Sequence, residues 1–200
     1  MIPEDILNAV GAELKSFSKG ELLFTEGSEP LFYYQIKSGA IKMNNYNDDG
    51  KEYIQGIFET GKSFGEPPLL AKVPYPANAE AIVESKIWRL PKIEFISLLS
   101  NHPDIHITFT TLLASRLYYK AVMVSEISNQ EPEHRILRII DYMKKQSGNV
   151  DQRATQSYRV DLTRQQLADL TGLRVETVIR TIKKLENKGE LYIKNRKVYR

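Results

Sequence analysis

The chain has 200 residues, of which 42% are hydrophobic, and this is enough to bury the core of one large or two small domains. The sequence contains no cysteine, which excludes disulfides, thiolate zinc sites and cysteine-ligated iron–sulfur clusters. No apolar run is long enough to span a bilayer and no basic-then-apolar signal opens the chain, so we expect a cytoplasmic protein without a membrane partner.

Charge is distributed unevenly along the chain. The net charge is only +3, but residues 159–200 carry +6 and residues 1–158 carry −3. Lys and Arg side chains that neutralise phosphates release counterions, so a basic segment favours contact with a polyanion. The pattern predicts that the C-terminal part binds nucleic acid.

Residues 14–98 consist of short apolar or alternating runs separated by glycines and other turn residues. Closely spaced runs of this kind are typical of a small antiparallel barrel or roll. Asp48, Asp49 and Gly50 resemble a hairpin turn, in which Asp and Gly tolerate positive φ. We interpret the glycines as turn residues and infer no chemistry from them. The predicted strands are 22–24, 32–36, 40–43, 53–58, 77–83 and 86–90.

A long helix is predicted from 101 to 128, because Asn101 can cap it, Pro103 fits its first turn and neither Pro nor Gly follows before residue 132. One face has the 4-3-4-3 spacing of a two-helix seam, and a second apolar face could cover the roll. Two apolar faces predict a homodimer through this helix; the alternative is a helix buried within one subunit. The seam consists of Leu113, Leu117, Lys120, Val124 and Ile127, and the face toward the roll of Phe109, Leu112 and Ala121.

Pro132 interrupts the helical pattern and marks a hinge or the start of a domain. We therefore expect two domains, 1–128 with the roll and the long helix, and 129–200. Helical spacing resumes over 133–146, and a polar loop then leads to a short strand at 158–162. The apolar residues of the resumed helix are Ile136, Leu137, Ile140 and Met143.

Residues 162–185 have the spacing of a helix-turn-helix, with two short helices joined at Gly172. Thr163 and Gln166 form a capping-box pattern at the start of the first helix. The alternative is an amphipathic hairpin whose charges are only solvated. The predicted buried residues are Leu167, Ala168 and Leu170 in the first helix and Val178, Ile182 and Leu185 in the second, which leaves Glu176, Thr177, Arg180 and Lys183 outside.

The outer face of the second helix has residue types that recognise bases. An Arg fork matches the O6 and N7 acceptors of guanine, and a Glu accepts from the amino group of cytosine. Glu176 and Arg180 lie one turn apart, so we expect them to read adjacent base pairs. Short runs at 190–193 and 197–199 flank the basic residues 194–196, which predicts a hairpin wing on the phosphate backbone.

Six short motifs occur along the chain in a fixed order. They are Lys-Gly-Glu-Leu-Leu-Phe-Thr-Glu-Gly (19–27), Asp-Gly-Lys-Glu (49–52), Phe-Gly-Glu (64–66), Glu-Ala (80–81), Asn-His-Pro-Asp (101–104) and Val-Glu-Thr-Val-Ile-Arg (175–180). Over about residues 14–200 the chain resembles the cyclic-AMP receptor protein/FNR (Crp/Fnr) family of bacterial transcription regulators. The resemblance implies an α+β fold. Its parts are an N-terminal antiparallel β-roll (cyclic-nucleotide-binding-like, a double-stranded β-helix), a long dimerisation helix and a C-terminal winged helix-turn-helix.

The resemblance also implies partners. A homodimer would place two recognition helices in successive major grooves of double-stranded DNA, about 34 Å apart, on a two-fold-symmetric operator. RNA polymerase is a further expected partner, and a small-molecule effector would bind in the roll. Whether the protein activates or represses, and what the effector is, remain open.

The second helix resembles the FNR branch more closely, because Val175 precedes Glu176 where the cyclic-AMP receptor has an Arg. This resemblance implies a half-site with a T-G-A core, with Arg180 on the guanine and Glu176 on the paired cytosine. Val175 would relax or shift the outer guanine preference, and Ile179, which departs from both branches, leaves one flanking position unassigned. The expected phosphate contacts are Thr163, Arg174, Thr177, Lys183 and Arg196.

The resemblance implies an effector pocket but not cyclic AMP as its ligand. Cyclic-AMP binders of the family have a Gly-Glu pair and, further on, an Arg that forks onto the phosphate. Gly65 and Glu66 are present, but no Arg occurs between Glu66 and Trp88, and Lys120 with Ala121 replaces the adenine-contacting Thr-Ser pair. Lys120 could meet an acidic effector or set the register of the seam. The expected pocket residues are Gly65, Glu66, Tyr75, Ala77, Asn78 and Lys120.

Metal and cofactor chemistry is not expected. The FNR-type cluster needs several cysteines, and the haem-sensing branch needs a histidine in the roll, where none occurs. His102 and His106 lie at i and i+4 but are too few to hold zinc. Glu66 has no His or second carboxylate nearby in sequence for acid–base work. We therefore expect no catalytic residues, no metal, no cofactor and no enzymatic activity.

Three other functions compete with this interpretation. A cupin-type enzyme would need a histidine cluster in the roll, and a cyclic-nucleotide-controlled scaffold without a DNA role would need the phosphate-binding Arg and no basic C-terminus. The roll of this sequence has no histidine, the phosphate-binding Arg is absent, and the C-terminal part is basic, so neither function fits. A ligand-independent regulator of the same fold remains an open alternative.

Overall fold

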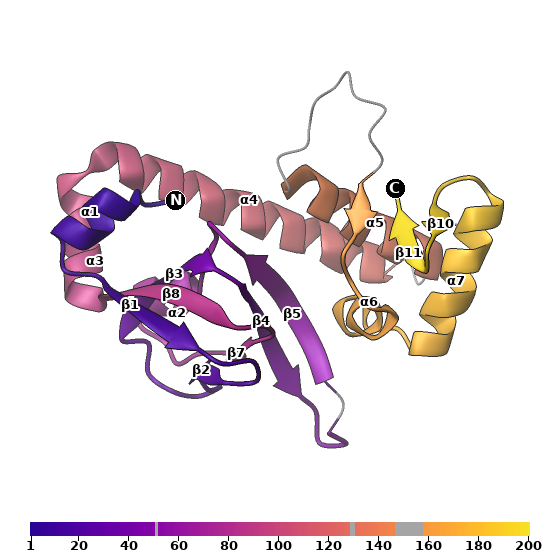
Figure 1. Ribbon diagram of the computed structural model, residues 1–200, viewed down its shortest axis with the longest axis horizontal. Helices are drawn as coiled ribbons and strands as arrows, with labels where there is room; N and C mark the ends of the chain where they lie inside the picture. The colour runs from indigo at the N-terminus through magenta and orange to yellow at the C-terminus, as the bar shows by residue number, and fades with distance from the viewer. Residues whose placement is uncertain (51, 129–130, 147–157) are drawn as a thin grey trace. The chain divides into compact units, whose positions relative to one another are not determined.

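The computed structural model describes residues 1–50, 52–128, 131–146 and 158–200, without the side chains of 122–128 and 146. The chain divides into two compact units, Met1–Ser115 and Arg116–Arg200. The division falls within a long helix, α4 (Pro103–Ser128), whereas the sequence predicts a domain boundary after that helix (Figure 1). We describe each unit in turn.

The first unit is built on two four-stranded sheets whose paired strands are all antiparallel. Their strand orders are β1-β8-β3-β6 and β2-β7-β4-β5, so the chain passes repeatedly from one sheet to the other, which gives the predicted roll. All six predicted strands are present: 22–24 has the predicted bounds, and the other five are shifted at one or both ends. The strands are β1 (Glu13–Phe17), β2 (Leu22–Phe24), β3 (Phe32–Ser38), β4 (Ala40–Tyr46), β5 (Glu52–Glu59), β6 (Ser63–Phe64), β7 (Asn78–Ala81) and β8 (Ser85–Pro91).

Three short helices of the first unit were not predicted: α1 (Glu4–Ala9), α2 (Glu66–Ala71) and α3 (Lys92–Asn101). The prediction that Asn101 caps the long helix is wrong. Asn101 is the last residue of α3 and donates a hydrogen bond to the Ser97 hydroxyl at 3.3 Å. The helices are separate because His102 precedes Pro103, and a residue before proline is disfavoured in helical conformation.

Two apolar clusters stabilise the first unit. One lies inside the roll and is rich in aromatic rings, such as Tyr34 and Phe64 with centroids 5.5 Å apart. The other joins the roll to α1, α3 and α4, where Tyr33 stacks on Phe95 at 4.5 Å. Phe109 of α4 is buried in this second cluster, as predicted, and Leu113 packs against it. Burial of these rings and aliphatic side chains fixes the start of α4 on the roll.

The second unit contains the end of α4, α5 (Pro132–Gln146), a helix-turn-helix and a small sheet. Ile136, Ile139 and Ile140 of α5 are buried, whereas the predicted Leu137 and Met143 are only half-buried. The predicted place of Ala121 against the roll is wrong, because this residue is exposed. The remaining elements are β9 (Arg159–Val160), α6 (Arg164–Thr171), α7 (Val175–Asn187), β10 (Tyr192–Lys194) and β11 (Lys197–Tyr199).

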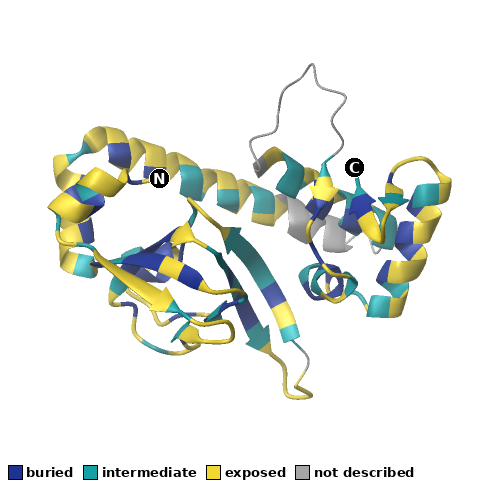
Figure 2. Cartoon of the chain, viewed as in Figure 1, coloured by how far each residue is buried: buried dark blue, intermediate teal, exposed yellow. Residues whose placement is uncertain are grey.

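Burial follows the layers within each unit (Figure 2). Buried residues lie along the facing sides of the strands and on one side of α6 and α7, while the other sides of these helices are exposed. None of the helices in the described part of the chain is long and apolar enough to cross a membrane.

Candidate nucleic-acid interface and effector pocket

The helix-turn-helix is held by local hydrogen bonds. The Thr163 hydroxyl accepts from the backbone N–H of Gln166 at 3.0 Å, and the Gln166 side chain accepts from the backbone N–H of Thr163 at 2.9 Å. This confirms the predicted capping box, which satisfies N–H groups that would otherwise lack partners. Gly172 ends α6 with a φ of 68°, a conformation that glycine adopts without strain. The turn therefore fixes the direction in which α7 leaves α6.

The buried side of the two helices largely follows the prediction. Val178, Ile182 and Leu185 of α7 are buried, as are Leu167 and Ala168 of α6. The predicted burial of Leu170 is only partial. The neighbouring Asp169 is buried, and its carboxylate accepts from the Gln165 side chain at 2.8 Å.

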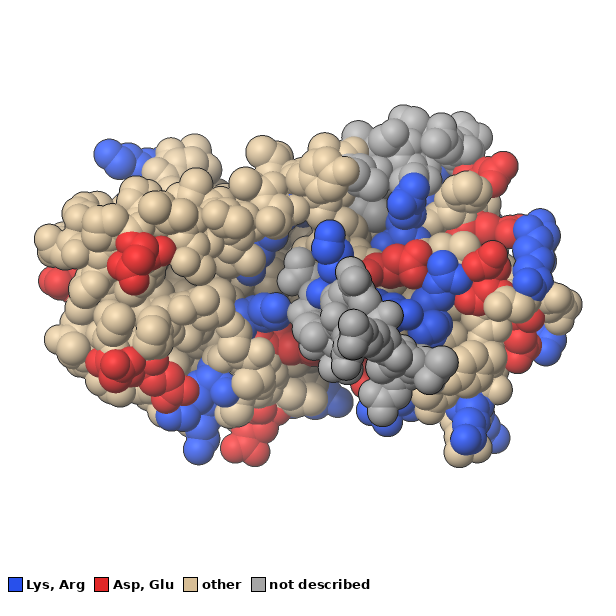
Figure 3. Space-filling model, turned by 90° about the horizontal axis from the view of Figure 1, so that it is seen from above, with Lys and Arg blue, Asp and Glu red and all other residues tan. Residues whose placement is uncertain are grey.

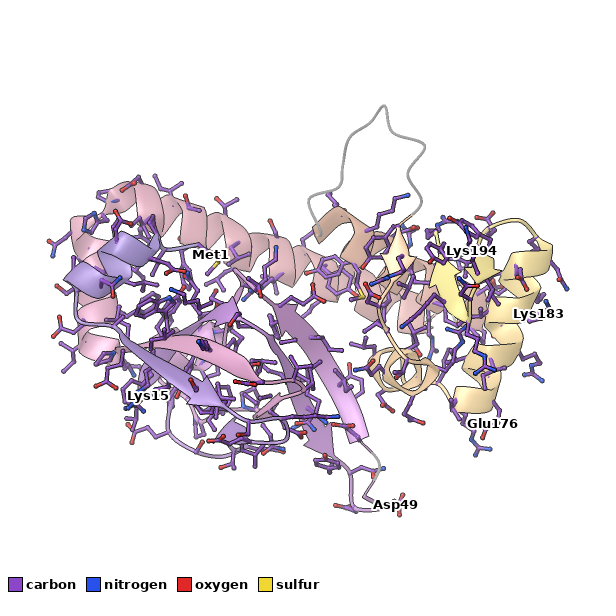
Figure 4. The ribbon with its side chains drawn as sticks, in the orientation of Figure 1. Met1, Lys15, Asp49, Glu176, Lys183 and Lys194 are labelled. Atoms are coloured by element: carbon purple, nitrogen blue, oxygen red, sulfur yellow. The ribbon has the colours of Figure 1, made fainter. Side chains whose placement is uncertain are left out.

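The outer side of α7 carries the predicted reading residues. Glu176, Arg180 and Lys183 are exposed, and Val175 and Thr177 are half-buried. Glu176 and Lys183 lie about two turns apart on this helix (Figure 4). Among the described residues, no partner forms an ion pair or a side-chain hydrogen bond with Glu176 or Arg180. Both side chains are therefore available to a ligand outside the chain.

The two lysines of α7, Lys183 and Lys184, and Lys188 at its C-cap differ from Arg180, because they are already paired. Lys183 contacts Glu186 at 2.6 Å, and this hydrogen bond is the main cause that lowers the pKa of Glu186. Lys184 and Lys188 contact the two carboxylate oxygens of Glu133 of α5 at 2.5 and 2.6 Å. The hydrogen bond from Lys184, and then that from Lys188, lowers the pKa of Glu133. The two pairs with Glu133 connect the C-terminal end of α7 to the start of α5.

The predicted wing is a hairpin of β10 and β11, which pairs with β9 in one antiparallel sheet. Asn195 and Arg196 form its tip with φ values of 48° and 62°, as a tight two-residue turn requires. Tyr192 stacks on Tyr199 across the strands at 4.9 Å. Arg196 is exposed at the tip, and the turn residues present it away from the sheet.

Charge over the second unit is mixed (Figure 3). On the face shown, Lys and Arg side chains lie among several Asp and Glu side chains. Ion pairs such as Arg200 with Asp141 at 2.8 Å account for part of this mixture. The excess of basic residues in the C-terminal part is thus not a uniform basic surface. The cations without a side-chain partner among the described residues include Arg174, Arg180, Lys194, Arg196 and Lys197.

In the expected effector pocket, the space beside Gly65 is occupied by side chains of the roll. Tyr75 is 2% exposed and stacks on Phe24, with ring centroids 3.6 Å apart. Gly65 lies against both rings, since a Cβ built there would come within 3.1 Å of Phe24 and 3.3 Å of Tyr75. The site therefore brings together Gly65, Glu66, Tyr75 and Ala77, all in or beside the core of the roll, with Asn78 half-buried at its edge.

Polar groups in this part of the roll are buried. Glu66 is 1% exposed, and its carboxylate accepts a hydrogen bond from the Ser63 hydroxyl. The Tyr75 hydroxyl has no hydrogen-bond partner among the described residues, and burial raises the pKa of this phenol well above its usual range. Nearby Tyr34 and Glu66 raise it further, so the hydroxyl stays protonated.

The expected dimer seam is described only in part. Leu117 is 71% exposed and Lys120 is exposed, while the side chains of Val124 and Ile127 lie outside the described residues. The sequence analysis did not single out Ile107 and Tyr118, which are 68% and 74% exposed on α4. Lys120 belongs to the second unit, so its place in the pocket stays a prediction. In the described part of the chain no group of three or more His, Asp or Glu could hold a metal.

Comparisons with known proteins follow this division into two units. Residues 14–102 match the model of the cyclic nucleotide-binding domain, and residues 134–199 match that of the Crp-like helix-turn-helix domain. The fumarate and nitrate reduction regulatory protein of Salmonella typhi is 25% identical over 194 residues, which are 96% of this chain and 76% of that protein.

Solved structures show the same fold. The c-di-GMP responsive global regulator CLP of Xanthomonas campestris matches with a TM-score of 0.75 at 22% identity, over 98% of this chain and 96% of that one. FixK2 from Bradyrhizobium japonicum matches with a TM-score of 0.76 at 19% identity, over 94% of this chain and 91% of that one. The roll, the long helix and the winged helix-turn-helix therefore occur together in these proteins.

Proposed function

Because this chain belongs to the Crp/Fnr family of transcription regulators, we propose that it binds, as a homodimer, a two-fold-symmetric operator whose half-sites contain T-G-A. It is a DNA-binding regulator with an N-terminal sensing domain. The observation that carries the operator proposal is the exposure of Glu176 and Arg180, which have no side-chain partner among the described residues.

Base reading is assigned to the first two turns of α7. Arg180 donates to O6 and N7 of the guanine, and Glu176 accepts from the amino group of the paired cytosine. In this assignment both residues read one base pair, not the adjacent base pairs expected from their spacing. Removing the charged side chains of Glu176 and Arg180 from water costs free energy. This cost is offset only if the ligand supplies complementary hydrogen-bonding groups. The edge of a guanine–cytosine pair supplies both an acceptor pair and a donor.

Phosphate contacts surround the reading residues. Arg174 precedes α7, and Arg196 lies at the tip of the wing, so both extend the interface beyond the base edges. The Thr163 hydroxyl accepts in the capping box and keeps its own proton to donate to a phosphate oxygen. Thr177 and Lys183 complete the set, although Lys183 must exchange Glu186 for a phosphate.

Dimerisation is assigned to the exposed apolar side chains of α4. Leu117 and Tyr118 lie on the part of α4 that belongs to the second unit, and both expose more than two thirds of their surface, at 71% and 74%. A second copy of the helix would cover them. Symmetric pairing then sets the two recognition helices about 34 Å apart, one turn of DNA.

We also propose that cyclic AMP is not the effector. Tyr75 lies on Gly65, where the family's phosphate-binding segment begins, and the segment that follows has no Arg to pair with a cyclic phosphate. Burying that anion without a cation would cost several kcal/mol. The sensing domain then responds to another small molecule, or the regulator is ligand-independent. RNA polymerase as a partner, a cytoplasmic location and the lack of catalysis and cofactors are parts of this same proposal.

The experiment selects binding sites from random duplex DNA with the purified protein and measures Kd by fluorescence anisotropy. A palindrome with T-G-A half-sites, bound by two copies of the chain, is the expected result. Sites without two-fold symmetry would contradict the dimer, and symmetric sites without T-G-A would contradict the readout. Added cyclic AMP should leave Kd unchanged within twofold, and a larger change would refute the effector proposal.

A further inference from the structure

One exposed apolar side chain lies on the reading face of α7. Ile179 is 53% exposed, and it is the one large apolar residue exposed on this helix, all of whose residues are described. The other exposed positions of the helix are polar, and Glu176 and Arg180 are among them. Single exposed apolar side chains are common on protein surfaces, so the place of Ile179 beside Glu176 and Arg180, and not its exposure alone, bears on recognition.

The position of Ile179 is set by the helix geometry. At about 100° per residue, Ile179 projects roughly 60° from Glu176 and roughly 100° from Arg180 around the helix axis, within the same exposed face. Val175 lies four residues earlier and is half-buried. Val175 and Ile179 therefore form an apolar strip that leads from the core to the edge of the reading face, next to Glu176.

The chemistry of the major groove limits what this strip can recognise. Base edges there present hydrogen-bond donors and acceptors, and the C5 methyl of thymine is their apolar group. An isoleucine buried against a polar edge would leave that edge without a partner. Against a thymine methyl, the same side chain removes apolar surface from water on both sides.

We propose that Ile179 reads the methyl group of a thymine that neighbours the base pair bound by Glu176 and Arg180. Isoleucine is stiff about χ1 in a helix, so its two branches stay fixed in the groove and the contact costs little conformational entropy. This assignment rests on the proposed function. It adds a sequence preference that the Glu176 and Arg180 pair does not supply.

The test removes the methyl and the side chain separately. In the operator selected above, each thymine is replaced in turn by deoxyuridine, which lacks only the methyl, and Kd is measured for the wild-type protein and for Ile179→Ala. Wild-type binding should weaken about fourfold at one thymine of each half-site, the size of one buried methyl. Ile179→Ala should weaken binding to the thymine operator by at least the same factor and be insensitive to deoxyuridine at that position.

Two further variants complete the design. Ile93→Ala removes another isoleucine, 80% exposed on α3, and should leave every Kd unchanged. Ile179→Gln should shift the preference at that position from thymine toward adenine, since Gln pairs with adenine N6 and N7.

The outcomes separate the two proposals. If wild-type protein selects a symmetric T-G-A operator but tolerates deoxyuridine at every thymine within twofold, the methyl contact is wrong and the proposed function stands. A fourfold loss that persists in Ile179→Ala also refutes the contact. If no symmetric operator is selected, both proposals fail together. The deoxyuridine series uses the wild-type protein, so tolerance of deoxyuridine at every thymine refutes the contact even if the variants fail to fold.

Discussion

The reading face of α7 and the interior of the roll handle polar groups in opposite ways. On α7, Glu176 and Arg180 are exposed and have no side-chain partner among the described residues. In the roll, Glu66 is buried and bonded to Ser63, and the space beside Gly65 is filled by Tyr75 and Phe24. One region keeps its polar groups free for a ligand, and the other satisfies or covers them from within. Residue types therefore reveal the partner of the first region but not that of the second.

The largest expected effect comes from the filled pocket. Tyr75→Ala removes a buried ring and leaves a cavity, so the free energy of unfolding should fall by roughly 3–5 kcal/mol in urea titrations. Tyr75→Phe removes only a hydroxyl that lacks a partner among the described residues and should change stability by less than about 1 kcal/mol. Equal losses in both variants would show that the hydroxyl, and not the ring, matters. Operator affinity of the folded Tyr75→Phe protein should stay unchanged.

The second effect concerns the reading face. Here DNA affinity is expected to change while stability does not. Arg180→Ala should weaken operator binding by about 1–3 kcal/mol, roughly 5- to 150-fold, and loosen specificity at one base pair, with stability unchanged. A competition assay with single-base operator variants measures both. Arg89→Ala is the matched control, because Arg89 is paired with Glu13 at 2.8 Å in the first unit. Wild-type discrimination in Arg180→Ala would refute the assignment.

A smaller effect tests the support of the reading face. Thr163→Ala removes the capping box and should lower the free energy of unfolding by about 1 kcal/mol. Thr163→Ser keeps a hydroxyl acceptor and should recover most of this loss. Chemical unfolding followed by circular dichroism gives the comparison, and an unchanged stability in Thr163→Ala would show that the cap is not needed to hold α6.

The smallest effect is a pH dependence. The folded pKa of Glu133 is lowered by Lys184 and Lys188, so its two pairs stabilise the fold above the ordinary value of 4.5 and are lost as the pH falls below it. Glu133→Gln should therefore make stability slightly less sensitive to acid in that range. The carboxylate pairs at the surface, so the difference should be small and should shrink further in high salt. An acid response identical to that of the wild type would contradict the role of the pairs.

Local patterns predicted much of the fold. The strands with clear alternation and the capping box at Thr163 occur where expected, because neighbours along the chain determine both. β1 was missed, since four of its five residues are exposed at a sheet edge and show no alternation. α2 was missed because Pro67 and Pro68 in its first turn suggest a turn rather than a helix.

The candidate sites divide in the same way. The exposure of Glu176 and Arg180 follows from the period of one amphipathic helix, so the sequence alone predicts it. The stacking of Tyr75 on Phe24 joins segments far apart in the chain, and no local sequence pattern predicts it. Tyr75 was named as a pocket residue, but not as the side chain that fills the space beside Gly65.

The pairing of Glu133 with Lys184 and Lys188 couples the start of α5 mechanically to α7. Glu133 follows Pro132 at the start of α5, so the first turn of this helix is bound to the recognition helix through two short contacts. A displacement of the start of α5 would therefore be passed directly to the C-terminal end of the recognition helix, without a rearrangement inside the helix-turn-helix itself.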